Sequence, residues 1–95
     1  MWTSDMLRRA TYNIVKFFNF PFEAEKNYRV QNMRKEIKRM GGVLNFRIKK
    51  NSEGWIAECE TFKGIITGGT DPKATDEEIN LQIKDAILTA FGIPA

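Results

Sequence analysis

Apolar residues recur at helical spacing near the start of the chain, at Met6, Ala10, Ile14 and Phe17. This spacing predicts a helix that begins at Thr3 or Ser4 and ends near Phe18, before Pro21.

A second stripe, at Val30, Met33, Ile37 and Met40, predicts another helix over about residues 25–40. Gly41 and Gly42 follow it and are suited to a C-terminal cap. The other faces of this segment carry basic side chains, namely Arg29, Arg34, Lys35, Lys38 and Arg39.

After these glycines the hydrophobic period changes to two. Residues 44–49 and 55–60 alternate apolar and polar side chains, which predicts two antiparallel strands joined by a hairpin loop at 50–54. A third strand is predicted at Ile65-Ile66-Thr67, before Gly68-Gly69. The expected register of the hairpin pairs Lys50 with Trp55, Ile48 with Ala57, Phe46 with Cys59 and Arg47 with Glu58.

The last helix is predicted to begin at a capping box, in which Thr75 and Glu78 each bond an unpaired backbone donor. Its apolar stripe consists of Ile79, Ile83, Ala86, Ile87 and Ala90. Leu81 and Leu88 fall off this stripe and are expected to contact the first two helices or a second subunit. The predicted fold class is α+β: two N-terminal helices, a three-stranded antiparallel sheet and a C-terminal helix packed on the sheet, in the order α-α-β-β-β-α.

Composition and charge narrow the functional classes. The 95 residues, 42% of them apolar, suit one domain, 1–95, in which 1–41 form a helical extension and 43–92 form the core. The chain has no His, which excludes an imidazole base, acid or metal ligand. One Cys excludes an internal disulfide and favours a cytoplasmic setting. No apolar run is long enough to span a membrane, so no membrane association is expected.

Charge is divided unevenly along the chain. Residues 1–50 contain 12 basic and 4 acidic side chains, whereas residues 51–95 contain 3 basic and 8 acidic ones. This asymmetry steers a charged partner toward one side, or else it draws the two halves of one fold together.

The segment 43–92 resembles the small antitoxin-type domain of the HicB family in the order of several short motifs. These motifs are Lys49-Lys50-Asn51-Ser52-Glu53-Gly54, Trp55-Ile56-Ala57-Glu58, Phe62-Lys63-Gly64, Thr67-Gly68-Gly69-Thr70 and a final helix containing Ala86 and Ile87. The resemblance implies a partial RNase H-like fold that is usually oligomeric, so we expect a homo-oligomer. It also implies a domain that binds a small RNA-cleaving toxin of the HicA type and covers its active surface.

The function expected on this basis is a non-catalytic antitoxin, or a stand-alone relative, without a cofactor. Its contact residues are predicted on the third strand, with acidic residues at the rim facing a basic toxin. The predicted set consists of Glu58, Glu60, Ile65, Ile66, Thr67, Glu77 and Glu78.

Two other functions are weighed against this one. DNA or RNA binding is the alternative, through the basic helix around residues 29–39 with Arg29, Arg34, Lys35, Lys38 and Arg39. A solvated helix face explains the same charges without any partner. Metal-dependent cleavage is disfavoured because no spacing assembles three carboxylates at one site, so no catalytic residue and no metal ligand is assigned.

Overall fold

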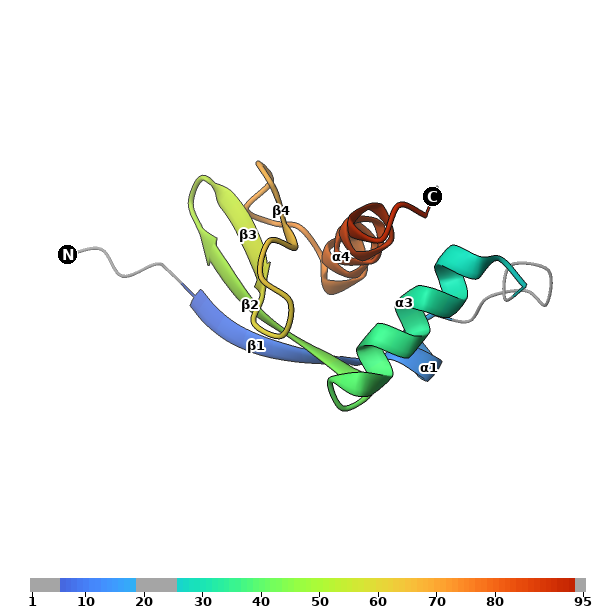
Figure 1. The fold of residues 1–95 in the computed structure, drawn as a ribbon. Helices are drawn as coiled ribbons and strands as arrows, with labels where there is room; N and C mark the ends of the chain where they lie inside the picture. The colour runs from blue at the N-terminus through green and yellow to red at the C-terminus, as the bar shows by residue number, and fades with distance from the viewer. Residues whose placement is uncertain (1–5, 19–25, 94–95) are drawn as a thin grey trace.

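The computed structural model describes residues 6–18 and 26–93. Within these ranges, four antiparallel strands form one sheet in the order β1-β2-β3-β4. Figure 1 shows helices α3 and α4 on the same side of this sheet. The strands are β1 (Met6–Asn13), β2 (Val43–Asn51), β3 (Gly54–Cys59) and β4 (Ile66–Gly69), and the helices are α1 (Ile14–Phe17), α3 (Tyr28–Arg39) and α4 (Asp76–Ala90).

The predicted three-stranded sheet with two N-terminal helices is wrong. Most of the segment predicted as the first helix is strand β1, which pairs with β2 and is followed only by the single turn α1. Over the described residues, the element order is therefore β-α-α-β-β-β-α. The predicted start of that helix, at Thr3 or Ser4, lies outside the described residues.

The side chains of β1 explain why the strand was not recognised from the pattern. Arg8 lies on the helix-facing side, where its guanidinium pairs with Asp76 at 2.9 Å, whereas the exposed Leu7 lies on the opposite side. Hydrophobicity along β1 therefore does not alternate as a half-buried strand requires. Pairing with β2 decides the conformation, because β2 would otherwise present an unpaired edge.

Helix α3 is present as predicted but begins at Tyr28. The Asn27 side chain accepts a hydrogen bond from the Arg29 backbone N–H at 2.8 Å and caps its first turn. At the other end, the Gly42 N–H donates to the Ile37 carbonyl at 2.9 Å, with Gly42 at φ +82°. The predicted start near Glu25 lies outside the described residues.

The hairpin of β2 and β3 has the predicted register. Lys50 pairs with Trp55, Ile48 with Ala57, Phe46 with Cys59 and Arg47 with Glu58. Strand β4 then pairs with β3, which places Ile66 opposite Glu58.

Helix α4 begins at the predicted capping box, and both of its hydrogen bonds are present. Ile79, Ile83 and Ile87 are buried as their spacing predicts. The two leucines off the stripe differ, because Leu88 is buried and Leu81 remains 67% exposed.

The core lies between one face of the sheet and the two long helices. Buried side chains of α3, α4 and the alternate residues of β2 and β3 form a single cluster. The opposite sheet face carries no helix among the described residues. The largest fully buried side chains are Phe18, Phe46, Met33, Ile37, Leu44, Ile48, Ile79, Ile83, Ile87 and Val30.

None of the helices in residues 6–18 and 26–93 is long and apolar enough to cross a membrane.

Candidate functional site

The acidic and apolar residues predicted to contact a partner are divided between two sides of the sheet. Glu58 and Ile66 are cross-strand neighbours on the open face, and Ile66 is 52% exposed. Glu77 and Glu78 lie in the first turn of α4, on the side that carries the helices. The sheet itself separates the two groups.

Both carboxylates of the open face are already paired with arginines. Glu60 accepts from the Arg9 Nε at 3.1 Å, and Glu58 accepts from an Arg47 nitrogen at 3.5 Å. These pairs are exposed, so each contributes little stability, about 0–1 kcal/mol. They nevertheless lower the free negative charge of the open face.

Two of the three third-strand residues predicted as contacts do not project from the open face. Ile65 is only 5% exposed and belongs to the core, and its carbonyl accepts from the Cys59 N–H at 2.9 Å. Thr67 is half-buried and lies opposite Ala57, on the side of the sheet that faces the helices. Ile66 alone presents its side chain at the open face.

Strand β4 is an edge of the sheet, with outward-directed backbone groups. The Cys59 N–H bonds the Ile65 carbonyl, and hydrogen-bonded pairs recur at every second residue of an antiparallel ladder. The backbone groups of Thr67 and Gly69 therefore bond to β3. The N–H and C=O groups of Ile66 and Gly68 therefore point away from the sheet. Such an edge accepts a further strand from a partner.

A groove lies between the β4 edge and α4. Trp55 contributes its indole ring to the lining, and Leu81 exposes its side chain in the same groove. Glycine is required in the nearby strand, because a Cβ on Gly69 would lie 2.6 Å from the Trp55 Nε1. The complete lining is Trp55, Gly68, Gly69, Thr70, Asp71, Ala74, Glu78, Leu81 and Gln82.

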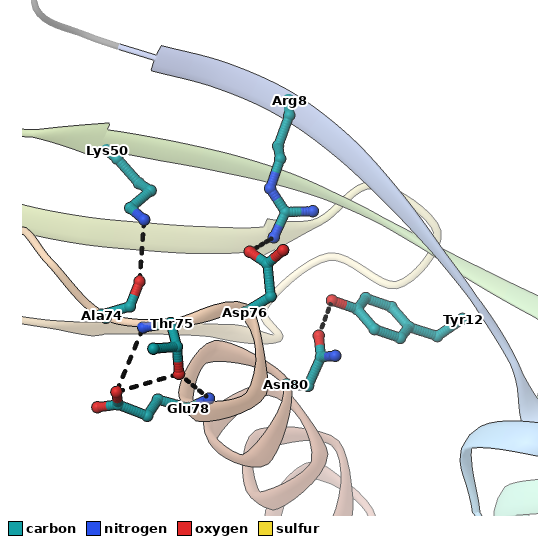
Figure 2. Close-up of polar contacts among 8 residues, drawn as sticks. All are labelled: Arg8, Tyr12, Lys50, Ala74, Thr75, Asp76, Glu78 and Asn80. Carbon is teal, nitrogen blue, oxygen red and sulfur yellow. Dashed lines mark hydrogen bonds and ion pairs between the residues drawn. The ribbon is translucent and has the colours of Figure 1, made fainter.

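The first turn of α4 forms the acidic end of this groove. Figure 2 shows Glu78 accepting from the Thr75 N–H at 3.3 Å and the Thr75 hydroxyl at 3.1 Å, while Asp76 pairs with Arg8. These two carboxylates therefore hold the helix in place. Glu77 is exposed, and Asp71, also exposed, accepts a local bond from the Lys73 N–H.

Two polar contacts tie α4 and the loop before it to β1 and β2. The Tyr12 hydroxyl donates to the Asn80 Oδ1 at 2.7 Å, and the Lys50 ammonium donates to the Ala74 carbonyl at 2.9 Å (Figure 2). Burial raises the pKa of Tyr12 above its usual 10.0; Arg8 opposes this rise, and Asp76 adds to it. Tyr12 is therefore a neutral hydrogen-bond donor that links β1 to α4.

The five basic residues of α3 do not play equal roles. Arg29 donates to the Gly92 carbonyl at 2.7 Å and Arg34 donates to the Phe18 carbonyl at 3.2 Å, so both connect α3 to other segments. Lys35 and Lys38 are exposed, while Arg39 pairs with Glu36 at 3.2 Å. A shallow depression on α3 is lined by Gln31, Arg34, Lys35, Lys38 and Arg39.

Residues 6–18 and 26–93 contain no group of three His, Cys, Asp or Glu residues placed to hold a metal ion. Cys59 is buried, and its Sγ accepts from the Phe62 N–H at 3.3 Å. The thiol therefore behaves as a core side chain.

The groove was not predicted from the sequence, although both of its apolar residues had a signal. The sequence places Trp55 at the start of a predicted strand and Leu81 off the apolar stripe of the last helix. Their proximity depends on how α4 crosses beside β4, which no local pattern encodes.

The chain matches no protein-family model, no curated protein and no solved structure.

Proposed function

We propose that this protein is a non-catalytic binding protein that masks a small basic RNA-cleaving toxin, as its resemblance to HicB antitoxins implies. The observation that carries the proposal is the open β4 edge beside an acidic, partly apolar groove. The order β2, β3, β4, α4 over residues 43–90 is also compatible with the motifs on which the resemblance rests. A cytoplasmic location is part of the same proposal.

The partner binds by adding a strand to β4. Its main chain bonds the outward groups of Ile66 and Gly68, and an apolar side chain enters the groove between Trp55 and Leu81. The exposed carboxylates of Asp71 and Glu77 attract a basic segment and speed its association. Glu58 and Glu60 contribute less, because arginines of the same chain neutralise them.

Co-expression with the product of the adjacent gene tests the function. The expected result is a stable complex with a small basic protein whose ribonuclease activity disappears when this chain is bound. Failure of the two purified proteins to associate, or full ribonuclease activity in the complex, would overturn the proposal.

Two matched pairs of variants then test the β4 edge by isothermal titration calorimetry. Ile66→Pro removes an outward N–H, whereas Ile66→Ala keeps it and removes only the side chain. Leu81→Glu places a charge in the groove, whereas Met40→Glu makes the same change at an exposed residue after α3. We expect Ile66→Pro and Leu81→Glu to weaken binding by about tenfold or more relative to their controls. Equal affinities within each pair would exclude β4 as the contact while leaving the function intact.

Nucleic-acid binding through α3 is the second candidate function. Four of its cations line one depression on the helix, and phosphate contacts by such residues make affinity fall steeply with salt. Changing Lys35, Lys38 and Arg39 to Ala removes three of them, and changing Lys49, Lys63 and Lys73 to Ala removes the same charge elsewhere. Affinity for a labelled oligonucleotide is then measured at several salt concentrations. If α3 binds nucleic acid, the slope of log affinity against log salt concentration should be smaller for the α3 variant and unchanged for the control variant. Identical slopes for the two variants would refute it.

A further inference from the structure

Strand β1 forms the other edge of the sheet and is twice as long as β4, with eight residues against four. It contains neither Pro nor Gly. Natural proteins usually shorten, interrupt or charge such an edge to prevent pairing with another chain. The edge at β1 is neither shortened nor interrupted.

The outward backbone groups of β1 follow from the ladder. Glu60 N–H donates to the Asn45 carbonyl at 2.7 Å, so the odd-numbered residues of β2 bond toward β3 and the even-numbered ones toward β1. The β1 residues that pair with the odd-numbered residues of β2 include Leu7, Arg9 and Thr11. Their N–H and C=O groups point away from the sheet. No backbone partner for these three residues occurs among residues 6–18 and 26–93.

The charges of β1 do not protect this edge. Arg8 pairs with Asp76 at 2.9 Å, and Arg9 pairs with Glu60 at 3.1 Å, each within the same chain. These carboxylates reduce the charge that the arginines present at the edge, so the edge can still pair in a register that keeps the arginines of the two copies apart.

We propose that two copies of this chain pair through their β1 strands, antiparallel about a two-fold axis at Ala10. In this register Ala10 lies opposite Ala10 of the partner subunit, and Arg9 lies opposite Thr11 of the partner subunit. The outward groups of Arg9 and Thr11 then bond each other across the axis. The pair at the axis consists of two small side chains, which allows close approach of the strands.

Neighbouring registers are less favourable. An axis at Arg9 or at Arg8 places two arginines directly opposite each other, which is destabilising. An axis at Thr11 avoids this conflict but leaves Leu7 beyond the paired region. The axis at Ala10 is the register that pairs most of β1 without placing like charges opposite each other.

The dimer joins both sheets into one continuous antiparallel sheet and removes both β1 edges. Because β4 is the opposite edge, the dimer carries one β4 groove at each end. A dimer of this kind therefore leaves two sites for the partner of the proposed function, although the pairing itself does not depend on that function.

Disulfide trapping tests the register. In a Cys59→Ala background, Ala10→Cys places two thiols at the axis, in a non-hydrogen-bonded pair whose Cα atoms are about 4.5 Å apart. We expect mild oxidation to convert this variant to a covalent dimer on a non-reducing gel. Thr11→Cys in the same background faces Arg9 rather than itself and is expected to stay uncrosslinked. Absence of the Ala10→Cys dimer, or equal crosslinking of both variants, would overturn the proposed register.

Sedimentation equilibrium tests the dimer without a crosslink. The wild-type chain is expected to dimerise over concentrations up to about 100 µM. Thr11→Pro removes an outward N–H and leaves the β2 ladder intact, whereas Thr11→Val keeps that N–H. The Pro variant should be monomeric and the Val variant dimeric, with circular dichroism confirming that both are folded. A monomeric wild type, or dimers that persist in folded Thr11→Pro, would refute the pairing.

Discussion

Single side chains hold α4 in position over the sheet. The Tyr12 hydroxyl bonds Asn80 from β1, and the Thr75–Glu78 capping box closes the first turn of the helix (Figure 2). The capping box lies at the acidic end of the groove and the Tyr12–Asn80 bond lies on the β1 side of the helix, and each is open to a test by conservative substitution.

Tyr12→Phe removes the hydroxyl and its hydrogen bond to Asn80. At pH 7 we expect a loss of about 1 kcal/mol in the free energy of unfolding, measured by urea denaturation. The raised pKa of Tyr12 means that above pH 10 the unfolded chain loses this proton before the folded one does. The wild type therefore loses stability as pH rises past 10, and the variant lacks this contribution. If the difference in unfolding free energy between wild type and Tyr12→Phe stayed constant from pH 7 to high pH, this result would contradict a raised pKa for Tyr12.

Thr75→Ala removes the N-cap hydroxyl of α4. The expected loss is about 1 kcal/mol of unfolding free energy, because a backbone N–H of the first turn loses its acceptor. Thr89→Ala, at an exposed position in the last turn of the same helix, is the control and should change the stability little. Equal effects of the two substitutions on the urea midpoint would count against the capping box.

At the scale of elements, the turn between β2 and β3 controls how closely β4 approaches. Gly54 has φ +143°, and a Cβ there would overlap the carbonyl oxygen of Gly69 on β4. Gly41 has φ +107° after α3, but a Cβ there would meet no atom within 4 Å. The two glycines share a positive φ and differ in their surroundings.

Gly41→Ala should lower the unfolding free energy by about 1–2 kcal/mol, which is the cost of holding a residue with a Cβ at positive φ. Gly54→Ala should cost clearly more, because main-chain atoms of β4 must also move away. Urea denaturation of both variants measures the difference. Equal losses would show that β4 does not approach Gly54 as closely as the structure has it.

At the scale of the whole molecule, the two long helices share one core with the sheet. Met33 of α3 and Ile83 of α4 are both fully buried in the cluster that includes the inner side chains of β2 and β3. The Arg29–Gly92 hydrogen bond also joins the start of α3 to the end of α4. The chain is therefore expected to unfold as one unit.

Met33→Ala and Ile83→Ala should each lower the free energy of unfolding by about 2–5 kcal/mol. Both variants should keep a single transition, in which circular dichroism coincides with Trp55 fluorescence measured in a Trp2→Phe background. Separate transitions in Met33→Ala would mean that α3 is stabilised independently of the sheet.

Local signals in the sequence determined the elements whose partners are close along the chain. The β2–β3 hairpin register, the glycine cap at the C-terminal end of α3 and the capping box of α4 follow from the sequence, because each depends on residues a few positions apart. The Asn27 cap at the start of α3 was not among the predictions. The alternation that buries Phe46 and Ile48 and exposes Asn45 is of the same kind.

Only the tertiary structure decided the conformation of residues 6–13 and the location of the candidate site. The register that β2 sets turns Arg8 toward the helices, where Asp76 pairs with it, and turns Leu7 to the open face. The groove likewise joins Trp55 to Leu81, which lie on different elements. Contacts between residues so far apart along the chain depend on which surfaces the other elements leave exposed. A short window of sequence therefore does not predict them.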